Sequence, residues 1–78
     1  MIIIAREAQD GAKHTLEFRQ DNDIAIGHIV NTSLGNELVY SYFLEINDCL
    51  VMPSYSETRC LSVCIDNLVA DARSIIGG

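Results

Sequence analysis

Three cysteines are the residues of this chain with the most recognisable chemistry. Cys60 and Cys64 stand four residues apart, about one helical turn, and Cys49 comes from the preceding segment. Three thiolates and a histidine can hold zinc, but structural zinc sites usually draw their cysteines from a short knuckle rather than from one helix face. The sequence has no Cys-x-x-Cys pair, so a redox centre is not indicated. We therefore expect space-filling cysteines in a reduced protein, with no metal and no cofactor.

The two histidines, His14 and His28, are the candidates for acid–base catalysis. Nucleophilic catalysis needs a nucleophile, a base and an orienting acid together, and no sequence motif links such residues here. His28 alternates with Ile24, Ile26 and Val30, which favours a hydrogen-bonded core or edge histidine. His14 lies near a turn, where we expect it to be solvated. The sequence therefore predicts a protein that is not an enzyme.

The last two residues, Gly77 and Gly78, are a third candidate feature. In its length and in this diglycine end the chain resembles ubiquitin-like modifiers and sulfur carriers. In those families the glycines follow a β-strand of a β-grasp fold on a flexible tail. Here they follow a predicted helix directly, where a helix C-cap explains them. A diglycine-ended carrier stays an alternative.

Acidic residues outnumber basic ones, 11 to 5, which gives a formal net charge of −6 and a pI of about 4.5. Proteins that bind nucleic acids or anionic membranes need Lys and Arg, so both kinds of direct partner are disfavoured. A partner protein with a basic surface is favoured. Six acids fall on predicted strand exteriors or turns, where they form either one anionic surface or a scattered, solvated set: Glu17, Asp21, Asp23, Glu37, Glu45 and Asp48.

A hairpin over residues 37–52 is the element around which the chain has to be arranged. One side of its first strand is apolar: Leu38, Tyr40, Tyr42, Leu44 and Ile46. The other side alternates with it: Glu37, Val39, Ser41, Phe43 and Glu45. This period of two predicts a strand. Asn47-Asp48 predicts the turn, because both residues tolerate positive φ, and Pro53 ends the returning strand, residues 49–52.

Three further strands are predicted before that hairpin, over residues 2–9, 14–20 and 24–30. Asp10-Gly11 and residues 21–23 are turn signals between them, and residues 31–36 are a loop by composition. Leu16 and Phe18 point inward. Gly27, in mid-strand, indicates either a bulge or a close backbone approach.

A helix follows the strands and runs to Ile76. Its candidate N-caps are Ser54, Ser56 and Thr58. Its apolar stripe is predicted to consist of Leu61, Ile65, Leu68, Ala72 and either Ile75 or Ile76. The predicted fold is α+β, an antiparallel five-stranded β-meander with one C-terminal amphipathic helix packed on one face, in a single domain of residues 1–78.

One helix covers only one face of a sheet, so the opposite face is the place to look for function. Val39, Phe43 and Ile29 are predicted on that face. Either the sheet curls to bury them, or they form an exposed apolar patch.

In size and charge the chain resembles phage-encoded inhibitors of host defence, including anti-CRISPR proteins. The resemblance implies a non-enzymatic protein-binding module that blocks a basic, nucleic-acid-handling surface of a larger protein. The odd number of cysteines and the short apolar start favour the cytoplasm, that of a bacterial host if the gene is carried by a phage. A homodimer that pairs through its sheet is the alternative. The predicted partner-binding residues are Asp21, Asp23, Glu37, Glu45 and Asp48, with Val39 and Phe43 as apolar anchors.

Overall fold

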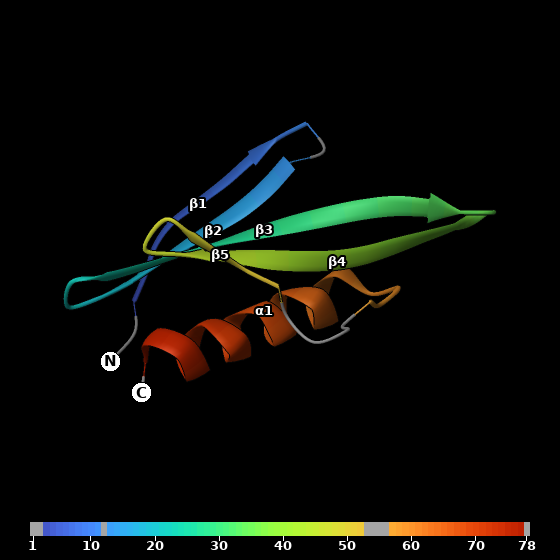
Figure 1. The fold of residues 1–78 in the computed structure, drawn as a ribbon. Coiled ribbons are helices and arrows are strands. Elements are labelled where there is room, and N and C mark those ends of the chain that lie inside the picture. The colour runs from blue at the N-terminus through green and yellow to red at the C-terminus, as the bar shows by residue number, and fades with distance from the viewer. Residues whose placement is uncertain (1–2, 12, 53–56, 78) are drawn as a thin grey trace.

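The computed structural model describes residues 3–11, 13–52 and 57–77. Within them, five strands form one antiparallel sheet in the order β1-β2-β3-β4-β5, and a helix follows (Figure 1). The predicted α+β meander with a C-terminal helix is confirmed. The elements are β1 (Ile3–Asp10), β2 (Lys13–Gln20), β3 (Asp23–Leu34), β4 (Glu37–Ile46), β5 (Cys49–Val51) and α1 (Leu61–Ile76).

Residues with positive φ make the turns between the strands. The predicted turn between β4 and β5 is confirmed, with φ of 49° at Asn47 and 68° at Asp48. Asp21, with φ of 54°, turns the chain from β2 to β3. The predicted loop over residues 31–36 is wrong for residues 31–34, and only residues 35–36 form a turn. The chain stays in β3 because residues 31–34 pair with residues 37–40 of β4, and Gly35, with φ of 64°, lies in the short turn.

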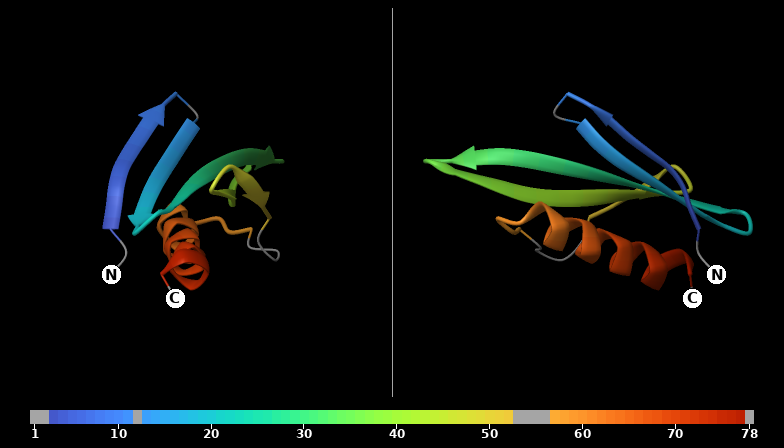
Figure 2. Two further views of the ribbon diagram at one scale, coloured as in Figure 1. Left: turned by 60° about the vertical axis from the view of Figure 1, so that its left-hand side comes forward. Right: turned by 180° about the vertical axis from the view of Figure 1, so that it is seen from behind.

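The helix α1 packs against β3 and β4 on one side of the sheet, which we call the inner face (Figures 1 and 2). The sheet is twisted, so β1 and β2 turn away from the direction of β3 and β4 (Figure 2). The core lies between this face and the helix. It is made of Leu16, Phe18, Ala25, Ile29, Tyr42 and Leu44 from the sheet and of Cys64, Leu68, Ala72 and Ile76 from α1.

Gly27 of β3 brings the helix close to the sheet. A Cβ atom at this position would lie only 2.5 Å from Cδ2 of Leu68, which is fully buried. The pairing of β3 with both neighbours runs through Gly27 without a shift in register. Of the two predicted roles, the close approach is therefore confirmed and the bulge is wrong.

The helix begins later than its capping residues predict. Its N-cap is Cys60, which makes no side-chain capping hydrogen bond. Thr58 is not the cap because its backbone pairs with β4: Tyr40 N donates to Thr58 O over 2.7 Å, and Thr58 N donates to Tyr40 O over 2.9 Å. Pro53, Ser54 and Ser56 lie outside the described residues.

The apolar stripe of α1 is confirmed at Leu68, Ala72 and Ile76, the second of the two predicted ends, and differs from the prediction at its start. Leu61 and Ile75 are exposed, at 36% and 45%, whereas Cys64, which was not predicted in the stripe, is buried. The buried positions recur every four residues, and the small residues among them let the helix lie close to the sheet. The predicted C-cap is confirmed at Gly77, whose N–H donates to Arg73 O over 2.8 Å; Gly78 lies outside the described residues.

Near the start of β4, the burial of Leu38 and Val39 is the opposite of what the alternation along the strand suggests. Leu38 is exposed at 45%, because the tip of the β3–β4 hairpin extends past α1 (Figures 1 and 2). Val39 is only 7% exposed, so of the two predicted alternatives burial holds for this residue, and its predicted role as an exposed anchor is wrong. Its short side chain stands beside Thr32, its cross-strand partner on β3.

Candidate functional site

The sheet has a second face, directed away from α1, which we call the outer face. Because Ala25, Gly27 and Ile29 face the core, the alternate residues of β3 must lie on the outer face. The prediction that Ile29 lies there is therefore wrong. Apolar side chains are exposed on it, with 38% for Ile24 and 40% for Val30. In the described part of the chain, no helix covers this face.

Two depressions hollow the sheet on this side. The first, the aromatic depression, has a volume of about 370 Å³ and is lined by Lys13, His14, Thr15, His28, Ile29, Val30 and Phe43. The second, the acidic depression, has a volume of about 300 Å³ and is lined by Glu17, Ile24, Ile26, Glu45, Asn47 and Asp48. Volumes of this size fit a large side chain or a small molecule.

His28 stands between the two depressions and holds two neighbours in place. Its ring stacks on that of Phe43, with the centroids 4.6 Å apart and an angle of 12° between the planes. Its Nε2 donates a hydrogen bond to Glu45 Oε1. The expected hydrogen-bonded histidine is confirmed, on the outer face rather than in the core. Phe43, a predicted anchor, is half-buried by this arrangement.

His14 is not solvated as predicted. Its side chain is 11% exposed, and its Nε2 lies 2.9 Å from Oε1 of Glu7 on β1. This contact with the neighbouring strand was not indicated by the position beside a turn.

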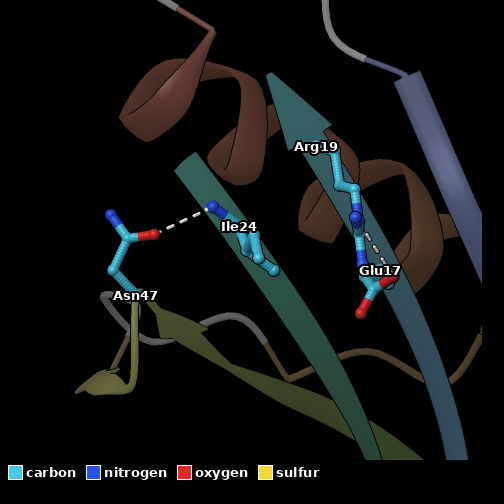
Figure 3. A network of polar contacts seen from close by, with 4 residues as sticks. All are labelled: Glu17, Arg19, Ile24 and Asn47. Atoms are coloured by element: carbon cyan, nitrogen blue, oxygen red, sulfur yellow. Dashed lines mark hydrogen bonds and ion pairs between the residues drawn. The ribbon is translucent and has the colours of Figure 1, made fainter. Parts of the chain in front are cut away.

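Asp23 and Asp48, far apart in the sequence, meet at one end of the sheet through Asn47. The backbone N–H of Ile24 donates to Asn47 Oδ1 over 2.9 Å (Figure 3), and Asn47 Nδ2 donates to Asp23 Oδ1 over 2.9 Å. Asn47 N donates in turn to Ile24 O over 2.9 Å. These contacts bring the β2–β3 and β4–β5 turns together.

Glu17 and Glu45 continue this acidic region onto the outer face. They are the cross-strand partners of Ile26 on its two sides. Glu17 Oε2 accepts a hydrogen bond from Arg19 Nε over 3.4 Å. Figure 3 shows this contact together with that of Asn47 and Ile24. We call the whole group the acidic end: Glu17, Asp21, Asp23, Glu45 and Asp48.

Glu37 does not belong to the acidic end. It lies eight residues from Glu45 along β4, which is about 26 Å at about 3.3 Å per residue. It forms an exposed ion pair with Arg59, at 3.0 Å. Of the seven predicted partner-binding residues, the structure therefore brings Asp21, Asp23, Glu45 and Asp48 together near Phe43, and separates Glu37 and Val39.

The sequence reasoning missed Asn47 as a connector and Ile24 and Ile26 as outer-face residues. Gly27 carried the missing signal. A glycine in mid-strand that allows a close approach indicates the side on which the helix packs, and hence the side on which its alternating neighbours are exposed.

The cysteines do not lie in this region as a group. Cys49 and Cys60 are exposed and Cys64 is buried. The hydroxyl of Ser62, 3.0 Å from Cys60 Sγ, and the backbone N–H groups of Val63 and Ser62 lower the pKa of Cys60, whereas burial raises that of Cys64.

Among residues 3–11, 13–52 and 57–77, no group of three or more His, Cys, Asp or Glu side chains is placed to hold a metal ion. No helix in these ranges is long and apolar enough to span a membrane.

Comparison with known proteins finds no matching family model, no similar curated protein and no similar solved structure. A functional proposal for this chain therefore rests on its own geometry and charge.

Proposed function

We propose that this chain is a non-enzymatic protein-binding module that docks through its outer face on a basic surface of a larger protein. One observation carries the proposal: exposed apolar side chains of the outer face lie directly beside the acidic end. Protein interfaces commonly combine a desolvated apolar centre with a polar rim. The net charge of −6 would in addition steer the chain toward a cationic surface.

The consequence of such docking is inhibition. The carboxylates of the acidic end would occupy Lys and Arg side chains that otherwise hold phosphates, and the sheet would exclude the nucleic acid sterically. The chain then acts like the phage counter-defence proteins that it resembles in size and charge, in the cytoplasm of a bacterial host. It needs no cofactor and no contact of its own with nucleic acid or membrane.

The experiment is an affinity capture from a lysate of the native host, with the captured proteins identified by mass. Glu45→Lys is compared with Glu37→Lys, because both variants change the net charge equally while only Glu45 belongs to the acidic end. We expect the unmodified chain to retain a basic nucleic-acid-handling protein at low salt and to lose it as salt rises.

The matched variants decide whether the outer face is responsible. We expect Glu45→Lys to abolish capture and Glu37→Lys to preserve it. NMR amide spectra of both variants should show that they are folded. Equal capture by the two variants, or equal loss, would show that general charge or another surface is responsible.

A homodimer is the second candidate, because the apolar side chains of the outer face can also pair with a second copy. Val30 and Leu50 are exposed at 40% and 64%. The mass in solution separates the two functions. A monomer supports the binding module, whereas a dimer that dissociates on Val30→Glu substitution would favour self-pairing through this face.

A further inference from the structure

We infer that the acidic depression receives an arginine side chain of the basic partner. This inference rests on the proposed function and names the side chain by which the partner is recognised. It combines three observations: a cavity, its apolar floor and the hydrogen-bonding state of the carboxylates around it.

The floor of the acidic depression fits the stem of a long cationic side chain. Ile24 is 38% exposed and Ile26 is half-buried, and both line a cavity of about 300 Å³. Arginine and lysine bury their methylene stems along apolar surface while the charged head stays in water. An apolar floor next to carboxylates therefore favours such a side chain over a bare cation, which has no apolar part to bury.

The carboxylates on either side of Ile26 are each engaged through one oxygen. Glu17 Oε2 accepts from Arg19, and Glu45 Oε1 accepts from His28. Among the described residues, Glu17 Oε1 and Glu45 Oε2 have no donor, and the carboxylate of Asp48 in the same depression has none either. Three acceptor groups are thus available to an incoming donor.

The spacing of these acceptors favours arginine over lysine. Glu17 and Glu45 lie two strands apart, which places their Cα atoms about 10 Å from each other. A guanidinium presents N–H donors on several edges and can bond to carboxylates on two sides. A lysine ammonium is a compact point charge, so it binds one carboxylate at the expense of the other.

The chain's own cations do not fill the depression. No Lys or Arg is among the described residues that line it. Arg19 is 59% exposed and reaches Glu17 over a long contact of 3.4 Å, and Arg6 pairs with Glu17 in the β1–β2 register and is exposed. Exposed pairs of this kind contribute little, so a partner's guanidinium can replace the Arg19 contact.

The test is an NMR titration of the isotope-labelled full chain with three small probes. Nα-acetyl-arginine amide carries the guanidinium, Nα-acetyl-lysine amide carries the same charge on an ammonium, and Nα-acetyl-citrulline amide is the neutral shape control. We expect saturable amide shifts confined to residues 17, 24–26 and 45–48, with a Kd of about 1–10 mM for arginine. Lysine should bind at least about fivefold more weakly, and citrulline should not bind.

Matched variants assign the binding to the carboxylates. Glu17→Gln combined with Glu45→Gln should abolish the saturable shifts, whereas Glu37→Gln, a control with its carboxylate outside the depression, should leave them unchanged. Equal affinity for the arginine and lysine probes, shifts that survive in the double variant, or shifts centred elsewhere would overturn the inference. Shifts that appear on concentrating the protein alone would overturn it too, because the occupant would then be a second copy.

The outcomes separate this inference from the proposed function. If Glu45→Lys abolishes capture of a basic partner but the arginine probe does not bind, the inference fails and the docking function stands. If the probe binds as expected but no basic protein is captured, the docking function fails and the arginine site remains.

Discussion

Replacement of Gly27 by alanine tests the close contact between β3 and α1 on the covered face of the sheet. The added Cβ would lie 2.5 Å from Cδ2 and 2.6 Å from Cδ1 of Leu68. Carbon atoms in contact normally stand about 3.5–4.0 Å apart, so Leu68 or the helix would have to move by about 1 Å. Leu68 is fully buried in the core and has little room to move.

Two effects of opposite sign act on this variant. Alanine lowers the conformational entropy of the unfolded chain, which stabilises the protein by about 0.5–1 kcal/mol. Overpacking of a filled core costs about 1–3 kcal/mol. Since three atoms of Leu68 lie within 3 Å of the new Cβ, we expect overpacking to prevail. The net destabilisation should be about 1–2 kcal/mol, or a decrease in Tm of roughly 4–16 °C for a domain of this size.

Urea unfolding followed by circular dichroism measures this effect, and a double-mutant cycle assigns it to the contact. Leu68→Ala alone should cost about 2–5 kcal/mol through the cavity that it leaves. In the Leu68→Ala background, Gly27→Ala should cost nothing or should stabilise. A neutral or stabilising effect of Gly27→Ala in the unmodified chain, or the same penalty in both backgrounds, would refute the close approach of α1 to β3.

Three further predictions concern the turns and the thiols. Asn47→Gly should destabilise the chain by about 1–2 kcal/mol in the same urea assay, because two side-chain hydrogen bonds are lost. Asn47→Ala should destabilise it more, because alanine also disfavours the φ of 49° at this position. Hydrogen bonds, first of all that of the Ser62 hydroxyl, lower the pKa of Cys60. Alkylation of Cys60 by iodoacetamide should therefore accelerate at a lower pH than alkylation of an unstructured cysteine peptide. Ser62→Ala should reduce the difference between the two pH values. Burial raises the pKa of Cys64 above the ordinary 9.0, so its thiol ionises first in the unfolded chain. The free energy of unfolding should therefore fall as pH rises through that value. A Cys64→Val variant whose free energy of unfolding falls with pH as steeply as that of the unmodified chain would contradict this.

Local signals in the sequence were sufficient for the order of the elements. The alternation in β4 and the turn chemistry of Asn47-Asp48 depend on near neighbours. The strand and the turn that they predict are confirmed, although the burial of Leu38 and Val39 differs from that alternation. The end of β3 depends on distant residues. The polar composition of residues 31–33 predicts a loop, but these residues stay in the sheet because they pair with residues 38–40 of β4. The start of α1 was missed for the same reason, because Thr58 pairs with Tyr40 instead of capping the helix.

The candidate site could be predicted only in part. The sequence places acids on strand exteriors and turns, but it does not say which of them meet. Asp23 and Asp48 are 25 residues apart and lie at the same end of the sheet because Asn47 joins their turns. The apolar part of the outer face depends on the side of β3 that faces the helix, and Gly27 marks that side through its close approach to Leu68.

The most direct test of the docking face is a map of the surface that the captured partner covers. Amide signals of the isotope-labelled chain are recorded with and without that partner. Binding through the outer face predicts that signals from Glu17, Ile26 and Glu45 shift or broaden, while those of exposed helix residues such as Ser74 do not. Perturbation confined to the exposed side of α1, with the outer face unchanged, would contradict the docking face and the function proposed for it.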